Sequence, residues 1–287
     1  MTLAIAGVTG NTGKAAATAL LERGQKVRVI VRDAAKGAPW KDKGAEVAVA
    51  DLGDPKALTR ALQGAKGAWL LIPPNMAVKE FRAYQDRITQ SFVSAIQESR
   101  IPHVAFLSSI GAQQPSRTGP ITGLHYAEEA LTKINATRFS FIRAAYFIEN
   151  TGGSLGMLDK GLLPSFVPAS FVFDMVAAAD IGSLAASVLE HGTSKTEVIE
   201  LASGRYSMND IAATLSTLAG KTIRVQEAPL DAMVPTLTGF GVPQEVAELY
   251  REMTEAIIDG RVAFEGTHRH VQGKTSLKEA LGKLLKP

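Results

Sequence analysis

The first thirteen residues constrain the fold of this chain more than any other stretch. A short apolar run over 2–6 leads directly into Gly7-Val8-Thr9-Gly10-Asn11-Thr12-Gly13, and a strong helix-forming segment follows at 15–23. A strand, a glycine turn and a helix in this order cradle phosphate groups, because the helix start offers free N–H groups and partial positive charge. The turn therefore predicts dinucleotide binding by Gly7, Thr9, Gly10, Asn11, Thr12 and Gly13.

Strand-forming and helix-forming segments alternate after this turn. We expect strands at 26–31, 46–50, 67–72, 103–107 and 138–143, and helices from Asp54 to Gly64, at 81–99 and at 124–134. This alternation predicts parallel strands joined by right-handed crossovers. The expected fold is therefore α/β, a doubly wound parallel sheet of Rossmann type, with its ligand crevice at the carboxyl ends of the strands.

The pattern changes after Asn150. Glycine and proline make 152–168 irregular, and the segments beyond predict helices opened by Asp180, Ser207 and Ser276 and another at 243–258, with strands at 197–201 and 222–226. We expect a dinucleotide-binding domain at 1–150 and a smaller, mostly helical α/β substrate-binding part at 151–287. The boundary is soft, because such chains often return to the first domain.

Composition excludes several classes of protein. The 287 residues include no cysteine, which excludes disulfides, thiolate zinc sites and iron–sulfur clusters, and the net charge is only +3. No apolar stretch approaches the roughly 18 residues of a membrane helix. The first apolar run has no basic leader, so we expect a cytoplasmic protein with no signal peptide. Without a cluster of Lys and Arg, nucleic acid is not an expected partner. A homodimer through the helices at 81–99 and 124–134 stays open.

The end of the second predicted strand indicates which dinucleotide is bound. An acidic residue there would bind the ribose 2′-hydroxyl of NADH, but the chain has Arg32, with Lys36 one helical turn further on. A guanidinium forks onto a phosphate, so we expect NADPH to be preferred over NADH. The alternative for Arg32 is a solvated charge. Asp33 either caps a turn or reaches the ribose, and Asp51 with Leu52 either starts a helix or lies along the adenine edge.

Motifs spread over nearly the whole chain resemble the NmrA-like branch of the atypical short-chain dehydrogenases. They are Gly7–Gly13, Val31-Arg32-Asp33 with Lys36, Ala50-Asp51-Leu52-Gly53-Asp54, Leu107-Ser108-Ser109-Ile110-Gly111-Ala112, Arg143-Ala144-Ala145-Tyr146-Phe147-Ile148-Glu149-Asn150 and Ala179-Asp180-Ile181-Gly182. The family includes NADPH:quinone oxidoreductases as well as NADP-binding regulators without turnover. The resemblance therefore implies the fold more firmly than an activity.

The resemblance also implies site residues. Ser108 and Ser109 would lie beside the nicotinamide ribose, and Ile72, Pro73 and Pro74 would line the cofactor groove. The substrate pocket would be edged by Tyr146, Phe147 and Asn150, although core packing explains the first two equally well. Asn75 follows the fourth predicted strand at the crevice, where it either touches the substrate or serves the turn.

A catalytic pair common in short-chain dehydrogenases is missing. Their Tyr-x-x-x-Lys places a lysine one turn from the tyrosine that protonates an alkoxide. Here the residue four positions after Tyr126 is Ala130, and the nearest lysine, Lys133, lies about 10 Å from Tyr126 along the helix axis. Alcohol oxidation is thus disfavoured, whereas a quinone yields a weakly basic phenolate that needs little acid. His125 and Tyr126 are the candidate proton donors, with a surface or packing role as the alternative.

The first hypothesis is therefore an NADPH-dependent oxidoreductase that passes hydride to a quinone or similar conjugated small molecule. The second is an NADP(H)-sensing regulator, which would require a protein partner. A reductase of ene, imine or azo bonds is a third. His268 and His270 would point the same way on a strand, but only Glu265 offers a nearby carboxylate, so we expect no metal site. No serine lies in a nucleophile elbow, so hydrolase chemistry has no support.

Overall fold

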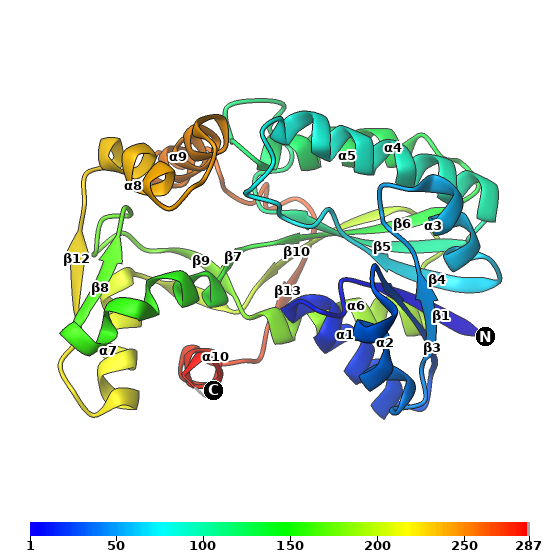
Figure 1. The fold of residues 1–287 in the computed structure, drawn as a ribbon, viewed down its shortest axis with the longest axis horizontal. Helices are drawn as coiled ribbons and strands as arrows, with labels where there is room; N and C mark the ends of the chain where they lie inside the picture. Colours follow the sequence, from blue (N-terminus) through cyan, green and yellow to red (C-terminus); the bar gives the residue numbers. More distant parts are fainter. Residues whose placement is uncertain (286–287) are drawn as a thin grey trace.

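The computed structural model describes residues 1–285 and is built on an eight-stranded parallel sheet (Figure 1). In sheet order its strands are β13 (Arg269–Gln272), β10 (Glu197–Ala202), β6 (Arg138–Ala144), β5 (His103–Ser109), β4 (Ala65–Leu70), β1 (Thr2–Ala6), β2 (Lys26–Val31) and β3 (Glu46–Val49). The strand order reverses direction between β1 and β4, which is where doubly wound sheets bind ligands. The Rossmann-type α/β fold is confirmed.

Helices cover both faces of the sheet. One face carries α1 (Asn11–Glu22), α2 (Ala34–Lys41) and α6 (Ala178–His191), and the other carries α3 (Pro55–Leu62), α4 (Phe81–Ser99) and α5 (Ile121–Thr132). The closest helix pair, α1 with α6, depends on Gly182, because an added Cβ there would overlap Ala15. Between the layers Trp69, Phe92 and Phe106 are fully buried. Each aromatic side chain of this size contributes a few kcal/mol through burial.

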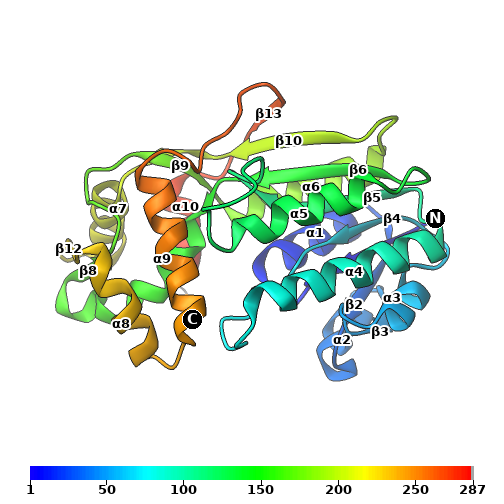
Figure 2. The same ribbon diagram turned by 90° about the horizontal axis from the view of Figure 1, so that it is seen from above.

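The second half of the chain both extends the main sheet and builds a smaller unit beside it. The strands β10 and β13 continue the sheet beyond β6, whereas β7 (Tyr146–Phe147), β9 (Phe173–Val176) and β11 (Gly204–Tyr206) form a separate small sheet, and β8 (Leu162–Ser165) pairs with β12 (Arg224–Glu227). Around these lie η1 (Ile148–Lys160), α7 (Met208–Ala219), η2 (Leu230–Ala232), α8 (Met233–Gly239), α9 (Gln244–Ile258) and α10 (Leu277–Leu284), seen from above in Figure 2.

Two apolar clusters correspond to these two parts. The first fills the main sheet and includes residues as late as Ala202 in the chain, and the second joins Ile110 and Ile148 to residues of α7, α9 and α10. Because α6, β10 and β13 return to the main sheet, residues after 150 belong to both clusters. The division of the chain into two domains at residue 150 stays a prediction. No helix within residues 1–285 is long and apolar enough to cross a membrane.

Most predicted elements are found, with shifted ends. The helix after the glycine turn begins at Asn11 rather than at 15, and the strand expected at 67–72 covers 65–70, so Ile72 lies beyond it. The helix α2 was not expected, because Gly37 and Pro39 lie inside it; Asp33 caps it and thereby offsets part of that disadvantage. The short strands β7, β8, β9 and β11 were also missed, since each is only two to four residues long.

Candidate functional site

The glycine turn after β1 has the shape that a pyrophosphate requires. Gly7 has a φ of +69°, which few other residues adopt, and an added Cβ on Gly13 would overlap the carbonyl oxygen of Ala6. At Gly10 the nearest atom to an added Cβ is the Gly7 carbonyl oxygen at 3.5 Å, so the turn is open on that side. Within residues 1–285 no side chain caps α1, and its first turn has no acidic residue. Its free N–H groups therefore fit an anionic diphosphate.

Both aspartates of uncertain role serve turns at the edge of this site. The Asp33 carboxylate accepts a hydrogen bond from the Ala35 N–H at 2.9 Å, and the Asp51 carboxylate accepts one from the Gly53 N–H at 2.7 Å. These bonds favour the turn interpretation of each residue, while Arg32 and Lys36 are exposed at the same edge. An exposed pair of cations suits a 2′-phosphate.

Two residues of α4 join this edge, and the sequence analysis missed both. The Tyr84 hydroxyl donates a hydrogen bond to the Pro73 carbonyl oxygen at 3.0 Å, and the Arg87 guanidinium lies 5.6 Å from the Tyr84 ring centroid. Burial raises the pKa of Tyr84, while Arg32 and Arg87 act to lower it and Asp51 to raise it, so all four groups lie close together. Their spacing on a helix gave no local signal, because α4 approaches this edge only through the fold.

Ser108 and Ser109 end β5, but their hydroxyls are already engaged. The Ser108 hydroxyl donates to the Glu128 carboxylate, and the Ser109 hydroxyl donates to the Ile110 carbonyl oxygen at 3.0 Å. Of the two, Ser108 is buried and Ser109 half-buried. Both serines thus stand at the end of β5, and the charge-assisted hydrogen bond to the Glu128 carboxylate ties Ser108 to α5.

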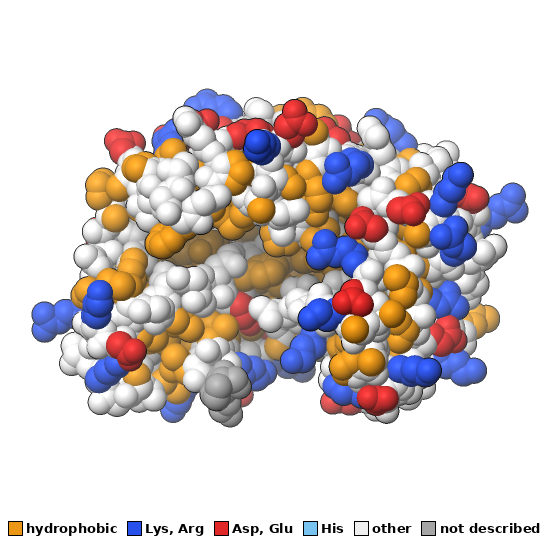
Figure 3. Space-filling view, in the orientation of Figure 1, with side chains coloured by type: hydrophobic (Ala, Val, Ile, Leu, Met, Phe, Trp, Pro, Cys, Tyr) orange, Lys and Arg blue, Asp and Glu red, His pale blue; other side chains and the backbone are white. Residues whose placement is uncertain are grey.

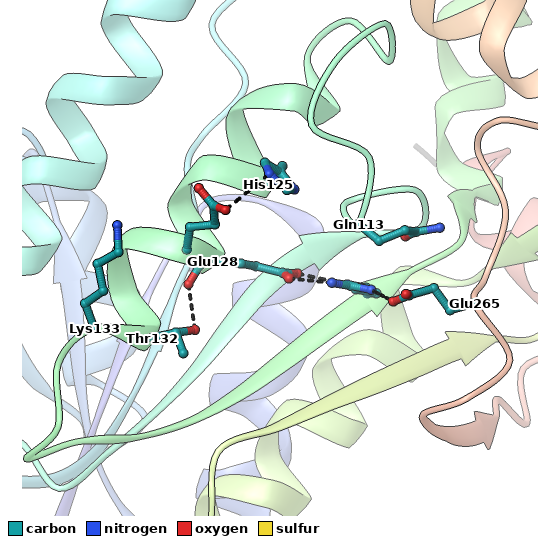
Figure 4. Close-up of a pocket in the computed structure, with 8 residues that line it drawn as sticks. Gln113, His125, Glu128, Thr132, Lys133 and Glu265 are labelled. Atoms are coloured by element: carbon teal, nitrogen blue, oxygen red, sulfur yellow. Dashed lines mark hydrogen bonds and ion pairs between the residues drawn. The ribbon is translucent and has the colours of Figure 1, made fainter.

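Glu128 belongs to an ion cluster that also contains Arg143, Glu265 and His268, and Figure 4 labels Glu128 and Glu265 of this cluster. The Arg143 guanidinium donates to both Glu128 oxygens, at 3.1 and 2.7 Å, and also pairs with Glu265. The side chains of Arg143 and Glu128 are 8% and 10% exposed. Burial works against the charge of Arg143, but the hydrogen bonds that it donates to the two glutamates, and their negative charges, outweigh burial and raise its pKa. Together with Ser108 of β5, the cluster ties four segments of the chain to one another, namely β5, α5, β6 and residues 265–268.

The two candidate proton donors of α5 pack edge-to-face, with 5.1 Å between ring centroids, but have different other neighbours. His125 lines a depression of about 490 Å³ together with Glu128, Arg143 and Glu265, and its Nδ1 lies 2.9 Å from the Ala112 carbonyl oxygen. Tyr126 is 43% exposed, and the Arg82 guanidinium lies 4.3 Å from its ring centroid. The depression in Figure 4 is a shallow one on the α5 side and is distinct from the glycine turn.

The aromatic residues after β6 lie at the carboxyl edge of the sheet. Tyr146 is half-buried and packs edge-to-face on Phe173 with 5.3 Å between ring centroids. Phe147 packs against the main core. The Asn75 side chain accepts a hydrogen bond from the Ala77 N–H at 3.3 Å, which favours the turn interpretation of that residue. Figure 3 shows a hollow with hydrophobic walls between the α8–α9 pair and the helices below it.

The fold and its glycine turn define a protein of the Rossmann class, and comparison with known proteins gives the family. A sequence model of the NmrA-like family matches residues 1–274, so the chain belongs to the NmrA-like family, as its motifs indicated. Quinone oxidoreductase 2 of Escherichia coli K12 is 27% identical over 86% of this chain and 85% of its own length. NAD(P)H azoreductase of Xenophilus azovorans is 23% identical over 87% and 85%, respectively.

Solved structures show the same fold. The NADPH-dependent quinone oxidoreductase of E. coli in complex with NADPH superposes with a TM-score of 0.81 at 23% identity, covering 99% of this chain and 100% of that one. The Citrobacter triphenylmethane reductase in complex with NADP(H) gives a TM-score of 0.80 at 21% identity, with the same coverage.

Proposed function

We propose that this chain is an NADPH-dependent oxidoreductase that reduces a quinone or a similar conjugated small molecule. The observation that carries the proposal is the uncapped start of α1 behind the Gly7–Gly13 turn, at the sheet edge where the aromatic residues after β6 also lie. Its curated relatives in E. coli and Xenophilus azovorans are named as quinone and azo reductases, which supports a redox reaction with a conjugated acceptor.

Different residues of the chain would bind different parts of the cofactor. The N–H groups of Asn11, Thr12 and Gly13 would hold the diphosphate, and the exposed Arg32 and Lys36 would hold the 2′-phosphate. Thr9 and Gly10 would face the diphosphate, Asp51 and Leu52 the adenine, and Ser108 and Ser109 the nicotinamide ribose, with Ile72, Pro73 and Pro74 along the groove. NADPH bound there would supply a hydride, and the chain would orient it toward the acceptor.

The acceptor would lie in the hollow beyond the strand ends. Tyr146, Phe147 and Asn150 would edge it, and Asn75 would stand on the cofactor side. A flat conjugated ring suits aromatic walls, because ring faces and edges stack at about 4.5–7 Å. A quinone also needs little acid catalysis, which agrees with the absence of a lysine one turn after Tyr126.

The experiment mixes the purified protein with NADPH and a panel of quinones, azo dyes and simple ketones, and follows the loss of the nicotinamide absorbance. We expect turnover with quinones and little with ketones. Turnover of azo dyes alone would correct the acceptor. Tight NADPH binding without turnover of any acceptor would refute the proposal and favour the NADP(H)-sensing regulator, whose test is a protein partner that binds differently with NADP than with NADPH.

A further inference from the structure

Helix α4 packs directly on the turn that follows β3. An added Cβ on Gly53 in this turn would lie 3.3 Å from the Ile88 Cδ1 and 3.6 Å from the Arg87 Nε. Of these two neighbours on α4, Ile88 is buried and Arg87 is exposed. The Arg87 side chain therefore lies against the turn that also holds Asp51 and Leu52.

A tyrosine one helical turn earlier supports the Arg87 guanidinium. Its carbon lies 5.6 Å from the Tyr84 ring centroid, which is within the distance of about 6 Å for a cation–π interaction. The Tyr84 hydroxyl in turn donates a hydrogen bond to the Pro73 carbonyl oxygen at 3.0 Å, in the loop after β4. Because β1 and β2 lie between β4 and β3 in the sheet, Tyr84 and Arg87 stand beside the carboxyl ends of the strands that lead to the glycine turn and to Arg32.

Arg87 differs from the other arginine at the start of α4. The Arg82 guanidinium pairs with the Asp86 carboxylate at 2.9 Å and covers the Tyr126 ring at 4.3 Å. Within residues 1–285 the Arg87 guanidinium has no carboxylate oxygen within 4.0 Å, and it is exposed to solvent. The face of this planar cation that is turned away from Tyr84 is thus accessible to a flat ligand.

Arg32 and Asp51 follow neighbouring strands beside this cation. The Ala50 N–H donates a hydrogen bond to the Val31 carbonyl oxygen at 2.9 Å, which joins the residues directly before them. Arg32 therefore approaches the Asp51 turn from β2, and Arg87 approaches the same turn from α4. Two guanidinium groups around one carboxylate suit an adenosine that carries a phosphate, because bases stack on arginine planes and phosphates bind guanidinium groups.

We propose, on the basis of the cofactor site proposed above, that Arg87 binds the adenine of the nucleotide by stacking its guanidinium on the ring. Tyr84 is the positioning residue that keeps the guanidinium in place. Arg32 selects the 2′-phosphate, whereas Arg87 contributes affinity for the adenosine that NADPH and NADH share. The strength of nucleotide binding and the choice of nucleotide are thereby assigned to different arginines.

The test measures by calorimetry the dissociation constants of NADPH, NADH and adenosine 2′,5′-bisphosphate. We expect Arg87→Ala to weaken all three by the same factor, about 3- to 30-fold, because each ligand contains the adenine ring. Arg60→Ala is the matched control, since Arg60 is an exposed arginine on α3, and it should leave all three constants unchanged. A loss confined to the two ligands with a 2′-phosphate would assign Arg87 to that phosphate and overturn the stacking role.

Two further variants separate stacking from charge and from packing. Arg87→Lys keeps the charge but loses the plane, so its loss should approach that of Arg87→Ala. Full affinity in Arg87→Lys would contradict stacking. Tyr84→Leu should weaken binding as well, but should add little in the double variant with Arg87→Ala, since both changes remove one contact. Fully additive losses would overturn the positioning role of Tyr84.

The outcome for this inference is distinct from the outcome for the proposed function. If wild type binds no dinucleotide, the proposed function fails and this inference fails with it. If wild type binds both dinucleotides and Arg87→Ala binds them equally well, Arg87 is a solvated charge and only this inference fails. Thermal melting of each variant shows whether a lost affinity reflects lost folding.

Discussion

The proposed nucleotide end and the proposed acceptor end of this molecule are built in opposite ways. The cradle at the nucleotide end consists of consecutive residues, Gly7 to Gly13, whose backbone shape follows from local sequence. The proposed acceptor end joins Tyr146 to Phe171 and Phe173, which two separate segments of the chain bring together. A site made of backbone can be recognised in a sequence, whereas a site made of distant side chains becomes visible only in the folded chain.

The largest effect is expected from the ion cluster beneath the acceptor end. Arg143→Ala leaves the buried carboxylate of Glu128 without its cation, which should lower the free energy of unfolding by about 3–5 kcal/mol. Denaturant unfolding measures it. Arg269→Ala is the control, because its pair with Glu197 is more exposed, at 49% and 21%, and should be worth at most about 1 kcal/mol. Similar losses in both variants would mean that the buried cluster has no special weight.

A second prediction concerns the pH dependence of stability, which we attribute to a histidine of the main sheet that belongs to neither proposed end. Burial lowers the pKa of His103, at the start of β5, to about 4. In the unfolded chain the pKa of a histidine is about 6.5. Between this pKa and the folded value the unfolded chain binds more protons than the folded chain does. The contribution of His103 to stability is therefore fully present above this range and is lost as the pH falls through it. The loss is on the order of 3 kcal/mol. Unfolding curves at pH 7 and pH 4 measure it, and His103→Leu should remove this part of the slope.

Two glycines compare the ends directly. An added Cβ would overlap backbone at both Gly13 and Gly119, so each Ala variant should lose about 1–3 kcal/mol of stability. Gly13→Ala should weaken NADPH binding, whereas Gly119→Ala should shift α9 and lower kcat/KM for the acceptor with NADPH affinity kept. Gly239→Ala is the control, because an added Cβ there meets nothing within 4 Å. Calorimetry with NADPH and the quinone assay supply the two readouts. Parallel losses in both readouts would erase the distinction between the ends.

The smallest effect concerns the choice of nucleotide. Arg32→Ala should weaken NADPH about 10- to 100-fold and leave NADH nearly unchanged, since a charge-assisted bond to phosphate is worth roughly 1.5–3 kcal/mol. Arg87→Ala tests the neighbouring cation on α4, and Arg60→Ala is an exposed control on α3. Titration with both nucleotides measures the ratio. If Arg32→Ala leaves the ratio of the NADPH and NADH dissociation constants unchanged, Arg32 is a solvated charge that does not bind the 2′-phosphate.

Local signals predicted most of the fold. Asp54, Ser207 and Ser276 cap helices α3, α7 and α10, as the sequence indicated, because a cap is a contact between residues two or three apart. The capping of α2 by Asp33 had equal local support, but Gly37 and Pro39 concealed the helix behind it.

Long-range contacts were beyond the reach of the sequence. Tyr84 reaches Pro73 beyond β4 only because α4 packs where it does. The pattern around Tyr126 drew attention to α5, yet that ring faces Arg82 at the surface. A missing motif indicates what chemistry is disfavoured, but it does not indicate which distant residue takes over.

The order of strands has a consequence for synthesis of the chain. At one end of the sheet β10 pairs with β6 and β13 pairs with β10. Because β10 follows β6 by more than fifty residues, a ribosome releases β6 well before its neighbour. Until then the nascent protein exposes unpaired backbone N–H and C=O groups along β6, and strands of other chains can form hydrogen bonds with them. Slow translation beyond residue 150 would lengthen that exposure, and holding by a chaperone during this interval should improve the yield of native protein.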